Sequence, residues 1–597
     1  MLGNNARWSI ARRIATSGLL VLGLQLPAAS RAGCDLKTLE LPVRMVGHRA
    51  IATVGINGTK VPLIVDSGAF FSFLTEAAAQ QLDLRTRPLP GNMRIEGLTG
   101  GVTARVTTVA HLQLVNGDLP GIDFVVGGNE AGANAMGLLG RNILGFADTE
   151  YDLAHGVIRF AIPNDDCDKA NMAYWAGDTP VSMVELRHGF REKTPDIRTT
   201  LLLNGQKVTA MFDTGATTTV SLRAAHDVGV KDSDMLSEGR MTGAGRGKAD
   251  AWTASFDSVE LGGETVRHNR LEVGDFAMHD FDMLVGIDFF LSHHIYVSRQ
   301  QSRMYFTYNG GPVFALNASG PPDPAASASS AADAGAGDKL TADEYARRGA
   351  ASLARKEAAA ALADLDRACA LEPGNATFFV TRASVHLALK QPDKALADLD
   401  TALRLDPGQA DARIQRAGIH HFRKERDATL DDLATLDKTL APQSQIRMGM
   451  ALLYESLDMP AQALAQWNDW IPAHRNDIAL EHAWNGRCWA RVKLGIELDK
   501  ALDDCDEAVD ADPKNASYLD SRGWVYLRLD KLPKARADFD RSLAARPEGA
   551  WSLYGRGVTS LRLGETAQGL ADLAEARRAE PDIDARIKRA GLPTAPP

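Results

Sequence analysis

The sequence predicts a multidomain protein whose first half is all-β, with two similar domains in tandem, and whose second half is an all-α solenoid of repeats. Two internal periodicities carry this prediction. Blocks of the first half return after 146 or 147 residues, and the second half repeats every 34 residues. The composition also changes near residue 311, where large apolar side chains become rare. At about 100–200 residues per domain, 597 residues leave room for several domains.

Composition and charge describe an ordinary globular protein. Apolar residues make up 45% of the chain and charged residues 24%, which excludes gross disorder and a small disulfide-stapled scaffold. The net charge is −10 and no strongly basic block is present, so we expect no nucleic-acid partner. The five cysteines have no zinc spacing such as C-x-x-C, and we expect neither a metal nor another cofactor.

Residues 1–32 are predicted to be a secretory signal peptide, so we expect an exported protein, periplasmic or secreted. Basic residues within 7–13 precede the apolar run 14–26, and small residues follow. This run is too short to cross the ~30 Å core of a bilayer, and no later run is long enough for a stable membrane span. The alternatives are an uncleaved anchor and a lipid on Cys34, although Arg31 stands where a lipidation motif needs an apolar residue.

Residues 35–310 are predicted to be β-rich, because short apolar runs alternate with Gly, Asn and Asp turns. The Asn-Gly pair at Asn57 is a strong hairpin signal. Three blocks of this half occur twice and in the same order, which predicts two homologous domains, 35–165 and 175–310. The blocks are 57–61 with 204–208, 64–69 with 211–216, and 137–140 with 283–286.

A linker and a repeat array are predicted to complete the chain. Residues 311–340 are rich in Ala, Ser, Pro and Gly, which favours a flexible linker between two independently folding halves. Residues 341–595 repeat every 34 residues and resemble a tetratricopeptide-repeat array of about seven repeats, the fourth of them degenerate. The resemblance implies a groove for a protein partner. The residues that match one repeat are Tyr526, Ala535, Phe539 and Pro547.

The two copies of one block carry the chemistry. Each has an Asp-Ser-Gly or Asp-Thr-Gly triplet, at Asp66 and Asp213, with two apolar residues before it and Ala after it. Each is followed within its domain by two apolar residues and a Gly. Over most of residues 40–310 this pattern resembles the retropepsin-like aspartic peptidases. The resemblance implies that the two domains form a pseudo-dimer with one active site, in which a water lies between Asp66 and Asp213.

Residue chemistry explains why two such loops are needed. Peptide hydrolysis requires a base to activate water and an acid to protonate the substrate. Two carboxyls that share one site do not both ionise easily, so one serves as the base and the other holds a proton. The hydroxyls of Ser67 and Thr214 can form hydrogen bonds across the pseudo-twofold axis, and Gly68 and Gly215 let the two backbones approach closely.

Each domain is also predicted to supply a flap over the cleft. The second flap contains a GxGxxG-like pattern, but no helix follows it, so a hairpin tip is favoured over a phosphate-binding loop. The sequence departs from the family after the Asp triplets, where Phe70-Phe71 and Thr217-Thr218 replace acidic residues. We therefore expect more apolar substrate contacts on the first side. The candidate flap glycines are Gly97, Gly100 and Gly101, and Gly243 and Gly245.

Two disulfides are candidates in an exported protein. Cys34 and Cys167 bracket the first β domain and could tie its ends together. Cys488 and Cys505 fall on paired helices of one repeat and could form a bond, and two buried thiols are the alternative.

Three functions are compatible with these patterns. The first is an aspartic endopeptidase that acts on a peptide or protein substrate and is fused to protein-binding repeats. The second is a non-catalytic peptide-binding or scaffold protein. In the third, each β domain is half of an intermolecular dimer. The intact pair of Asp triplets favours the enzyme, because a binding protein has no need for both.

Overall fold

The computed structural model describes residues 34–595 except 91–94, 98, 129–131, 133, 188–195, 244–246, 277–279 and 315–339. The predicted signal peptide therefore lies outside the described residues. The chain divides into two compact units, Met1–Leu405 and Asp406–Pro597. No helix of the described part is long and apolar enough to cross a membrane.

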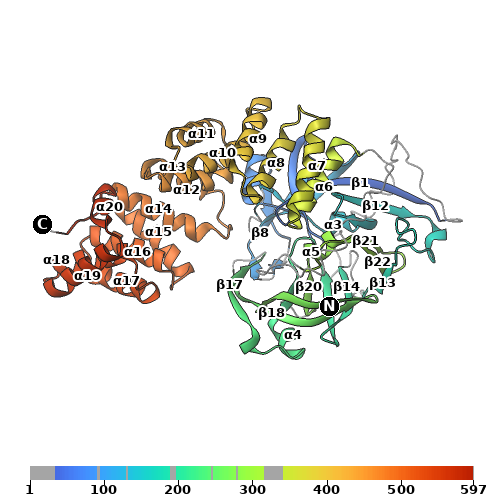
Figure 1. The fold of residues 1–597 in the computed structure, drawn as a ribbon, viewed down its shortest axis with the longest axis horizontal. Helices are drawn as coiled ribbons and strands as arrows, with labels where there is room; N and C mark the ends of the chain where they lie inside the picture. The colour runs from blue at the N-terminus through green and yellow to red at the C-terminus, as the bar shows by residue number, and fades with distance from the viewer. Residues whose placement is uncertain are drawn as a thin grey trace. The chain divides into compact units, whose positions relative to one another are not determined.

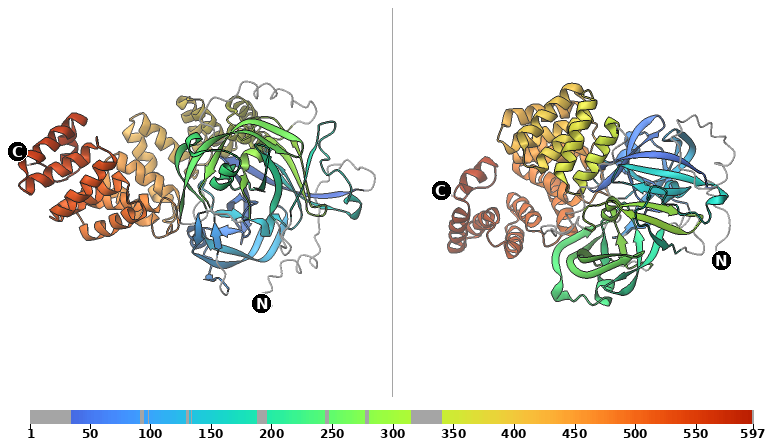
Figure 2. Two further views of the ribbon diagram at one scale, coloured as in Figure 1. Left: turned by 90° about the horizontal axis from the view of Figure 1, so that it is seen from below. Right: turned by 45° about the vertical axis from the view of Figure 1, so that its right-hand side comes forward.

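The first half is all-β and forms two barrels, as the sequence predicts (Figures 1 and 2). In the first barrel, β2 and β3 form the hairpin predicted at Asn57, and both turn residues have positive φ, 49° at Asn57 and 86° at Gly58. This conformation matches the twist of the flanking strands. The elements are β1 (Leu36–Val46), β2 (Arg49–Ile56), β3 (Thr59–Val65), β4 (Phe73–Leu74), α2 (Glu76–Gln81), β5 (Thr86–Pro88), β6 (Ile95–Gly97), β7 (Gly100–Val102), β8 (Ala104–Leu114), β9 (Gly117–Gly127), β10 (Gly137–Leu139), α3 (Arg141–Leu144), β11 (Asp148–Asp152) and β12 (Val157–Pro163).

The second barrel repeats this plan. Its hairpin turns at Asn204 and Gly205, again with positive φ. The strand before each Asp triplet pairs in parallel with a short later strand, β3 with β10 and β15 with β20. The elements are β13 (Ser182–Glu185), β14 (Ile197–Leu203), β15 (Gln206–Phe212), β16 (Thr219–Ser221), α4 (Leu222–Asp227), β17 (Leu236–Thr242), β18 (Lys248–Leu261), β19 (Glu264–Gly274), β20 (Met283–Val285), α5 (Ile287–Ser292), β21 (His293–Ser298) and β22 (Arg303–Tyr308).

One sheet joins the two barrels. Strand β11 of the first domain pairs antiparallel with β21 of the second, with Tyr151 opposite Ile295. Across this seam Nε2 of His294 lies 2.8 Å from a carboxylate oxygen of Glu150. Because backbone hydrogen bonds cross from one domain to the other, the barrels form one pseudo-dimer.

The second half is an array of helical hairpins, as predicted. Six of the described hairpins share one bidentate ion pair, in which an Arg on the first helix donates to both carboxylate oxygens of an Asp on the second. The pairs are Arg348–Asp364, Arg382–Asp398, Arg416–Asp432, Arg487–Asp504, Arg522–Asp538 and Arg556–Asp572. The helices are α6 (Ala342–Ala354), α7 (Ala358–Leu371), α8 (Ala376–Ala388), α9 (Pro392–Leu405), α10 (Ala410–Phe422), α11 (Arg426–Thr439), α12 (Ile446–Ser456), α13 (Pro460–Trp470), α14 (Leu480–Leu494), α15 (Leu498–Ala511), α16 (Ala516–Arg528), α17 (Leu532–Ala545), α18 (Ala550–Arg562), α19 (Thr566–Ala579) and α20 (Ile583–Arg589).

The boundary between the halves differs from the sequence expectation. Most of the predicted linker 311–340 lies outside the described residues. Phe314, at its start, is buried and its ring stacks 6.0 Å from that of Phe289 in α5. The first two hairpins, α6 to α9, belong to the same compact unit as the barrels. Apolar packing thus continues from the barrels into α6. Independent folding of the two halves stays a prediction.

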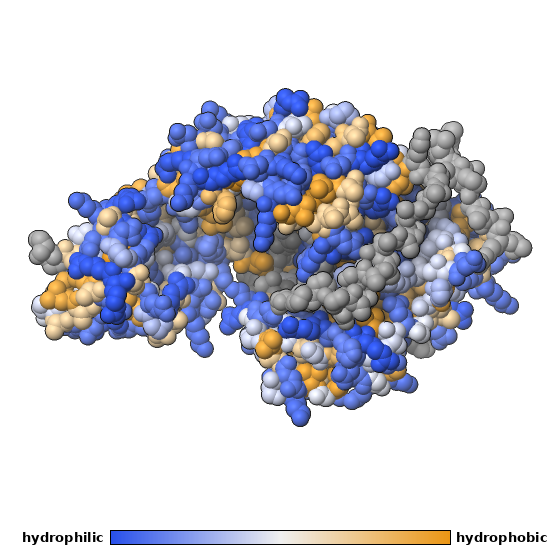
Figure 3. Space-filling model, viewed as in Figure 1, coloured by the Kyte–Doolittle hydropathy of each residue, from blue (hydrophilic) through white to orange (hydrophobic). Residues whose placement is uncertain are grey.

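The surface is ordinary for a globular protein. On the face drawn in Figure 3, hydrophilic residues predominate and hydrophobic residues form scattered patches. Exposed apolar residues in such patches are normal and need no partner to explain them.

Candidate active site

The two Asp triplets stand at equivalent places in the barrels. Asp66 follows β3 and Asp213 follows β15. The backbone N–H of Asp66 donates to the carbonyl of Leu139 at 3.0 Å, and that of Asp213 to the carbonyl of Val285 at 2.9 Å. The later apolar-apolar-Gly segments thus lie directly beside the Asp loops. Two positions that are 147 residues apart in the sequence become a matched pair.

Reciprocal hydrogen bonds lock the two loops together. The N–H of Ser67 donates to Oγ1 of Thr214, and the N–H of Thr214 donates to Oγ of Ser67, both at 3.0 Å. Each hydroxyl then donates into the other domain, Ser67 to the carbonyl of Phe212 at 3.2 Å and Thr214 to that of Val65 at 2.8 Å. Both side chains are fully buried. The structure therefore places these residues in the bridging arrangement that the sequence predicts.

Glycine is needed after each of these residues for reasons of space. A Cβ built on Gly68 would lie 2.4 Å from Cγ of Asp213, and one on Gly215 would lie 2.5 Å from Cγ of Asp66. Because Gly68 has no side chain, its N–H can approach both carboxyls. It donates to Oδ1 of Asp66 at 3.0 Å and to Oδ1 of Asp213 at 3.2 Å. The two carboxyls consequently meet beneath a shared backbone donor.

Burial raises the pKa of both carboxyls. Burial raises the pKa of Asp213 well above its usual value, and the negative charge of Asp66 raises it further. Burial also raises the pKa of Asp66, but the N–H of Ala69, 2.7 Å from Oδ1, and the nearby charge of Arg49 oppose this. Because the two carboxyls lie in one buried site, they titrate as a coupled pair.

Two arginines near the site escaped the sequence analysis. Arg49, at the start of β2, donates from Nη1 to the carbonyl of Gly215 in the opposite domain. Arg141 is buried, lies 3.8 Å from the carboxylate of Asp196 in the second domain and places its guanidinium 5.4 Å from the ring centre of Phe70. No local pattern distinguishes these arginines from others. Only the fold shows that both connect the domains.

The predicted flaps contact each other. Gly97, Gly100 and Gly101 lie in the hairpin β6–β7. Gly243 follows β17, whereas Gly245 lies outside the described residues. The N–H of Gly247 in the second flap donates to the carbonyl of Thr99 in the first at 2.8 Å. This backbone hydrogen bond joins the two flaps.

A second pair of equivalent side chains supports the Asp loops. In the first domain Ser72 donates to Oδ1 of Asn142 at 2.8 Å, and in the second Thr218 donates to Oδ1 of Asp288 at 2.6 Å. Burial raises the pKa of Asp288 to about 6. The sequence shows Asn142 and Asp288 at comparable positions of the duplication, but not that they hold the residues after the triplets.

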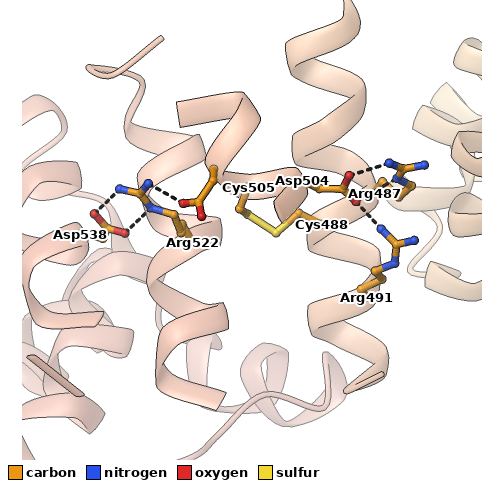
Figure 4. The surroundings of a disulfide bond; sticks show 8 residues. Arg487, Cys488, Arg491, Asp504, Cys505, Arg522 and Asp538 are labelled. Carbon is orange, nitrogen blue, oxygen red and sulfur yellow. Dashed lines mark hydrogen bonds and ion pairs between the residues drawn. A yellow bond between two sulfur atoms is a disulfide. The ribbon is translucent and has the colours of Figure 1, made fainter. Parts of the chain in front are cut away.

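The four candidate cysteines form two pairs in the structure. Cys34 is bonded to Cys167 across the first domain, and Cys488 to Cys505 between α14 and α15 (Figure 4). The fifth, Cys369, is a buried free thiol. Among the described residues, no group of three or more His, Cys, Asp or Glu side chains is placed to hold a metal ion.

Family models of aspartyl proteases match a part of each barrel. Residues 52–145 match the family model of the gag-polyprotein aspartyl protease, and residues 199–289 match a second family model, described as aspartyl protease. Each match spans one Asp triplet and its apolar-apolar-Gly segment. A search of curated proteins finds no match.

Three solved structures similar to this chain each cover 37–42% of it. A tetratricopeptide repeat protein from Parabacteroides merdae is 17% identical, with 42% of this chain and 98% of that chain covered and a TM-score of 0.31. The APC/C hetero-tetramer Cut9–Hcn1 is 14% identical, with 37% and 43% covered and a TM-score of 0.29. YrrB, a TPR protein with an unusual peptide-binding site, is 18% identical, with 38% and 98% covered and a TM-score of 0.23.

The family matches, the paired Asp loops and the 34-residue hairpin period agree with the resemblances seen in the sequence. The chain contains, in tandem, two domains that match aspartyl protease family models, followed by an array of helical hairpins with a 34-residue period.

Proposed function

We propose that this protein is an exported aspartic endopeptidase that hydrolyses peptide bonds in a peptide or protein substrate. One observation carries the proposal: the carboxyls of Asp66 and Asp213 meet within a symmetric hydrogen-bond network, and the pKa of each is raised. A peptide-binding protein gains nothing from burying two carboxyls against each other, which costs free energy unless they share a proton.

The proposed mechanism uses one ionised and one protonated carboxyl. Asp66, held ionised by nearby N–H donors, takes a proton from a water bound between the pair as the water oxygen attacks the peptide carbon. Asp213 gives its proton to the carbonyl oxygen. When the C–N bond breaks, the amine takes the proton from Asp66, and a hydroxyl proton of the diol returns to Asp213. The dyad is thereby restored.

The remaining parts of the chain have supporting roles in this proposal. Residues 1–32 direct export, and the two disulfides suit the oxidising compartment that export provides. The helical repeats hold a protein partner or substrate in their groove, which raises the local concentration of cleavable chain.

Removing either carboxyl tests the proposal. Asp66→Asn and Asp213→Asn each keep the side-chain size but remove one member of the acid–base pair, and we expect kcat to fall by about 10²–10⁴-fold. Cleavage is mapped on a denatured protein mixture. Asp257→Asn, at an exposed position on β18, is the matched control and should cleave at the wild-type rate.

The pH profile provides an independent arm of this test. A dyad with one shared proton gives a bell-shaped rate, with the alkaline limb set by loss of that proton. Wild-type activity in either Asn variant would refute the shared dyad. Peptide binding without any cleavage by the wild type would favour the scaffold alternative.

A further inference from the structure

Helix α6 of the first repeat presents two buried faces. One face packs on α7, where a Cβ built on Gly349 would lie 3.0 Å from Cγ of Leu365. The opposite face carries Ala350, Ala351 and Ala354, all buried. These three alanines belong to the hydrophobic cluster that fills both barrels. A repeat helix is thus part of the core of the protease-like region.

Contacts with the first barrel lie at the start of this face. Arg347 stands one turn before Ala351, so both project from the same side of the helix. A Cβ built on Gly156, in the turn between β11 and β12, would lie 2.5 Å from Cβ of Arg347 and 2.7 Å from the carbonyl of Val43 in β1. Only a glycine lets helix and turn approach so closely. Figure 1 shows α6 lying beside β1.

Contacts with the second barrel lie at the other end of α6. Arg355, which ends the helix, donates from Nη1 to the carbonyl of Leu291 in α5 at 3.5 Å and forms an ion pair with Glu357. A Cβ on Gly311, after β22, would lie 3.0 Å from Oε1 of Glu357. One hairpin therefore touches both barrels.

The tip of this hairpin also lies near the turn that precedes β2. Burial is the largest cause of the lowered pKa of His48. The second largest is the positive charge of Lys356, which lies between α6 and α7. The next residue, Arg49, donates to the carbonyl of Gly215. The tip thus faces the segment that reaches the second Asp triplet.

We propose that the α6–α7 hairpin is a brace that docks across the seam of the two barrels, so that the folded catalytic unit extends to residue 405. The partner of this barrel surface is a segment of the same chain. Part of the proposal rests on the proposed function, since the brace holds together the domains that supply Asp66 and Asp213. The docking itself does not depend on catalysis.

The test uses the full chain with a recognition sequence for a site-specific protease inserted between residues 315 and 339. After cutting, the mixture is run on a size-exclusion column without reductant. We expect the two fragments to elute together, at the volume of the uncut chain. An N-terminal fragment that elutes alone would overturn the proposal.

Point variants locate the contact. Ala351→Arg places a charge in the buried face, and Arg347→Asp changes a half-buried residue on the same side and leaves the apolar core of the hairpin intact. Both should release the fragments after cutting. Ala360→Arg, on the exposed side of α7, should leave them together. Co-elution of both test variants would show that this face is not the docking surface.

The elution volume tests the brace, and peptide cleavage tests the proposed function. A cut wild-type chain that stays together but cleaves no peptide would refute the proposed function and leave the brace in place. The opposite outcome is an N-terminal fragment that elutes alone and still cleaves peptides as the uncut chain does. That result would refute the brace and leave the proposed function in place.

Discussion

Single residues at equivalent positions of the two domains show how the halves have diverged. Asn142 and Asp288 perform the same task, since each accepts a hydrogen bond from the hydroxyl that follows its own Asp triplet. Asn142 does so as a neutral amide. Asp288 does so as a fully buried carboxyl whose pKa burial raises to about 6. At neutral pH the second domain therefore keeps an unfavourable negative charge in its interior.

We expect Asp288→Asn to stabilise the protein at neutral pH. The pKa of Asp288 is higher in the folded chain than in the unfolded chain, so its contribution is favourable below pH 4 and is lost as pH rises through 6. The amide keeps the acceptor for Thr218. Chemical denaturation should show a gain of about 2–3 kcal/mol in the free energy of unfolding at pH 7 and little change at pH 4.

Asp257→Asn removes a carboxyl of the same type at an exposed position and serves as the control, with an expected change within about 0.5 kcal/mol at both pH values. An equal effect of Asp288→Asn at pH 4 and pH 7 would contradict the electrostatic explanation.

At the scale of the elements, the flaps are the parts whose contact is easiest to disturb. A single backbone hydrogen bond joins Gly247 to Thr99, and a Cβ built on Gly247 would lie only 2.2 Å from the Thr99 carbonyl oxygen. A methyl group at this position must push the flaps apart. Closed flaps exclude water and hold the substrate.

Gly247→Ala should therefore raise KM severalfold, with a smaller effect on kcat, because the Asp loops lie on other elements. Steady-state kinetics on a short peptide measure this. Gly101→Ala is the control, since a Cβ there meets nothing within 4 Å. A loss of kcat at unchanged KM would show that the flap contact acts on the chemical step and not on substrate binding.

The elements that repeat in the sequence are the ones that could be predicted from it. The Asp triplets, their bridging hydroxyls and the helical hairpins recur at fixed intervals, so the pattern itself marks them. The docking of α6 on the barrels has no corresponding repeat in the sequence. Ala351, which faces the barrels, resembles any alanine packed between two repeat helices, and the positions of Arg49 and Arg141 depend on contacts between distant segments.

At the scale of the whole molecule, one chain supplies both halves of the site. The strands β11 and β21 pair across the domains, and the Asp loops interlock within the same chain. Covalent connection makes this assembly intramolecular, with an effective concentration that two free chains lack.

Specific activity should consequently not change on dilution over several orders of magnitude of enzyme concentration. Progress curves at fixed substrate and decreasing enzyme measure it, with sedimentation at the same concentrations as the check on mass. A steep fall in specific activity would instead indicate that domains of different chains pair.

Divergence between the halves also gives the cleft a direction. Phe70, 42% exposed and held by Arg141, stands four residues after one Asp, whereas Thr217 stands at the same distance after the other. A strictly symmetric dimer accepts a peptide equally well in either orientation. If the protein is a peptidase, we expect the two ends of a bound peptide to meet different side chains. Phe70→Thr should therefore change the residues preferred on one side of the cleaved bond, and an unchanged cleavage pattern would show that Phe70 and Thr217 do not discriminate.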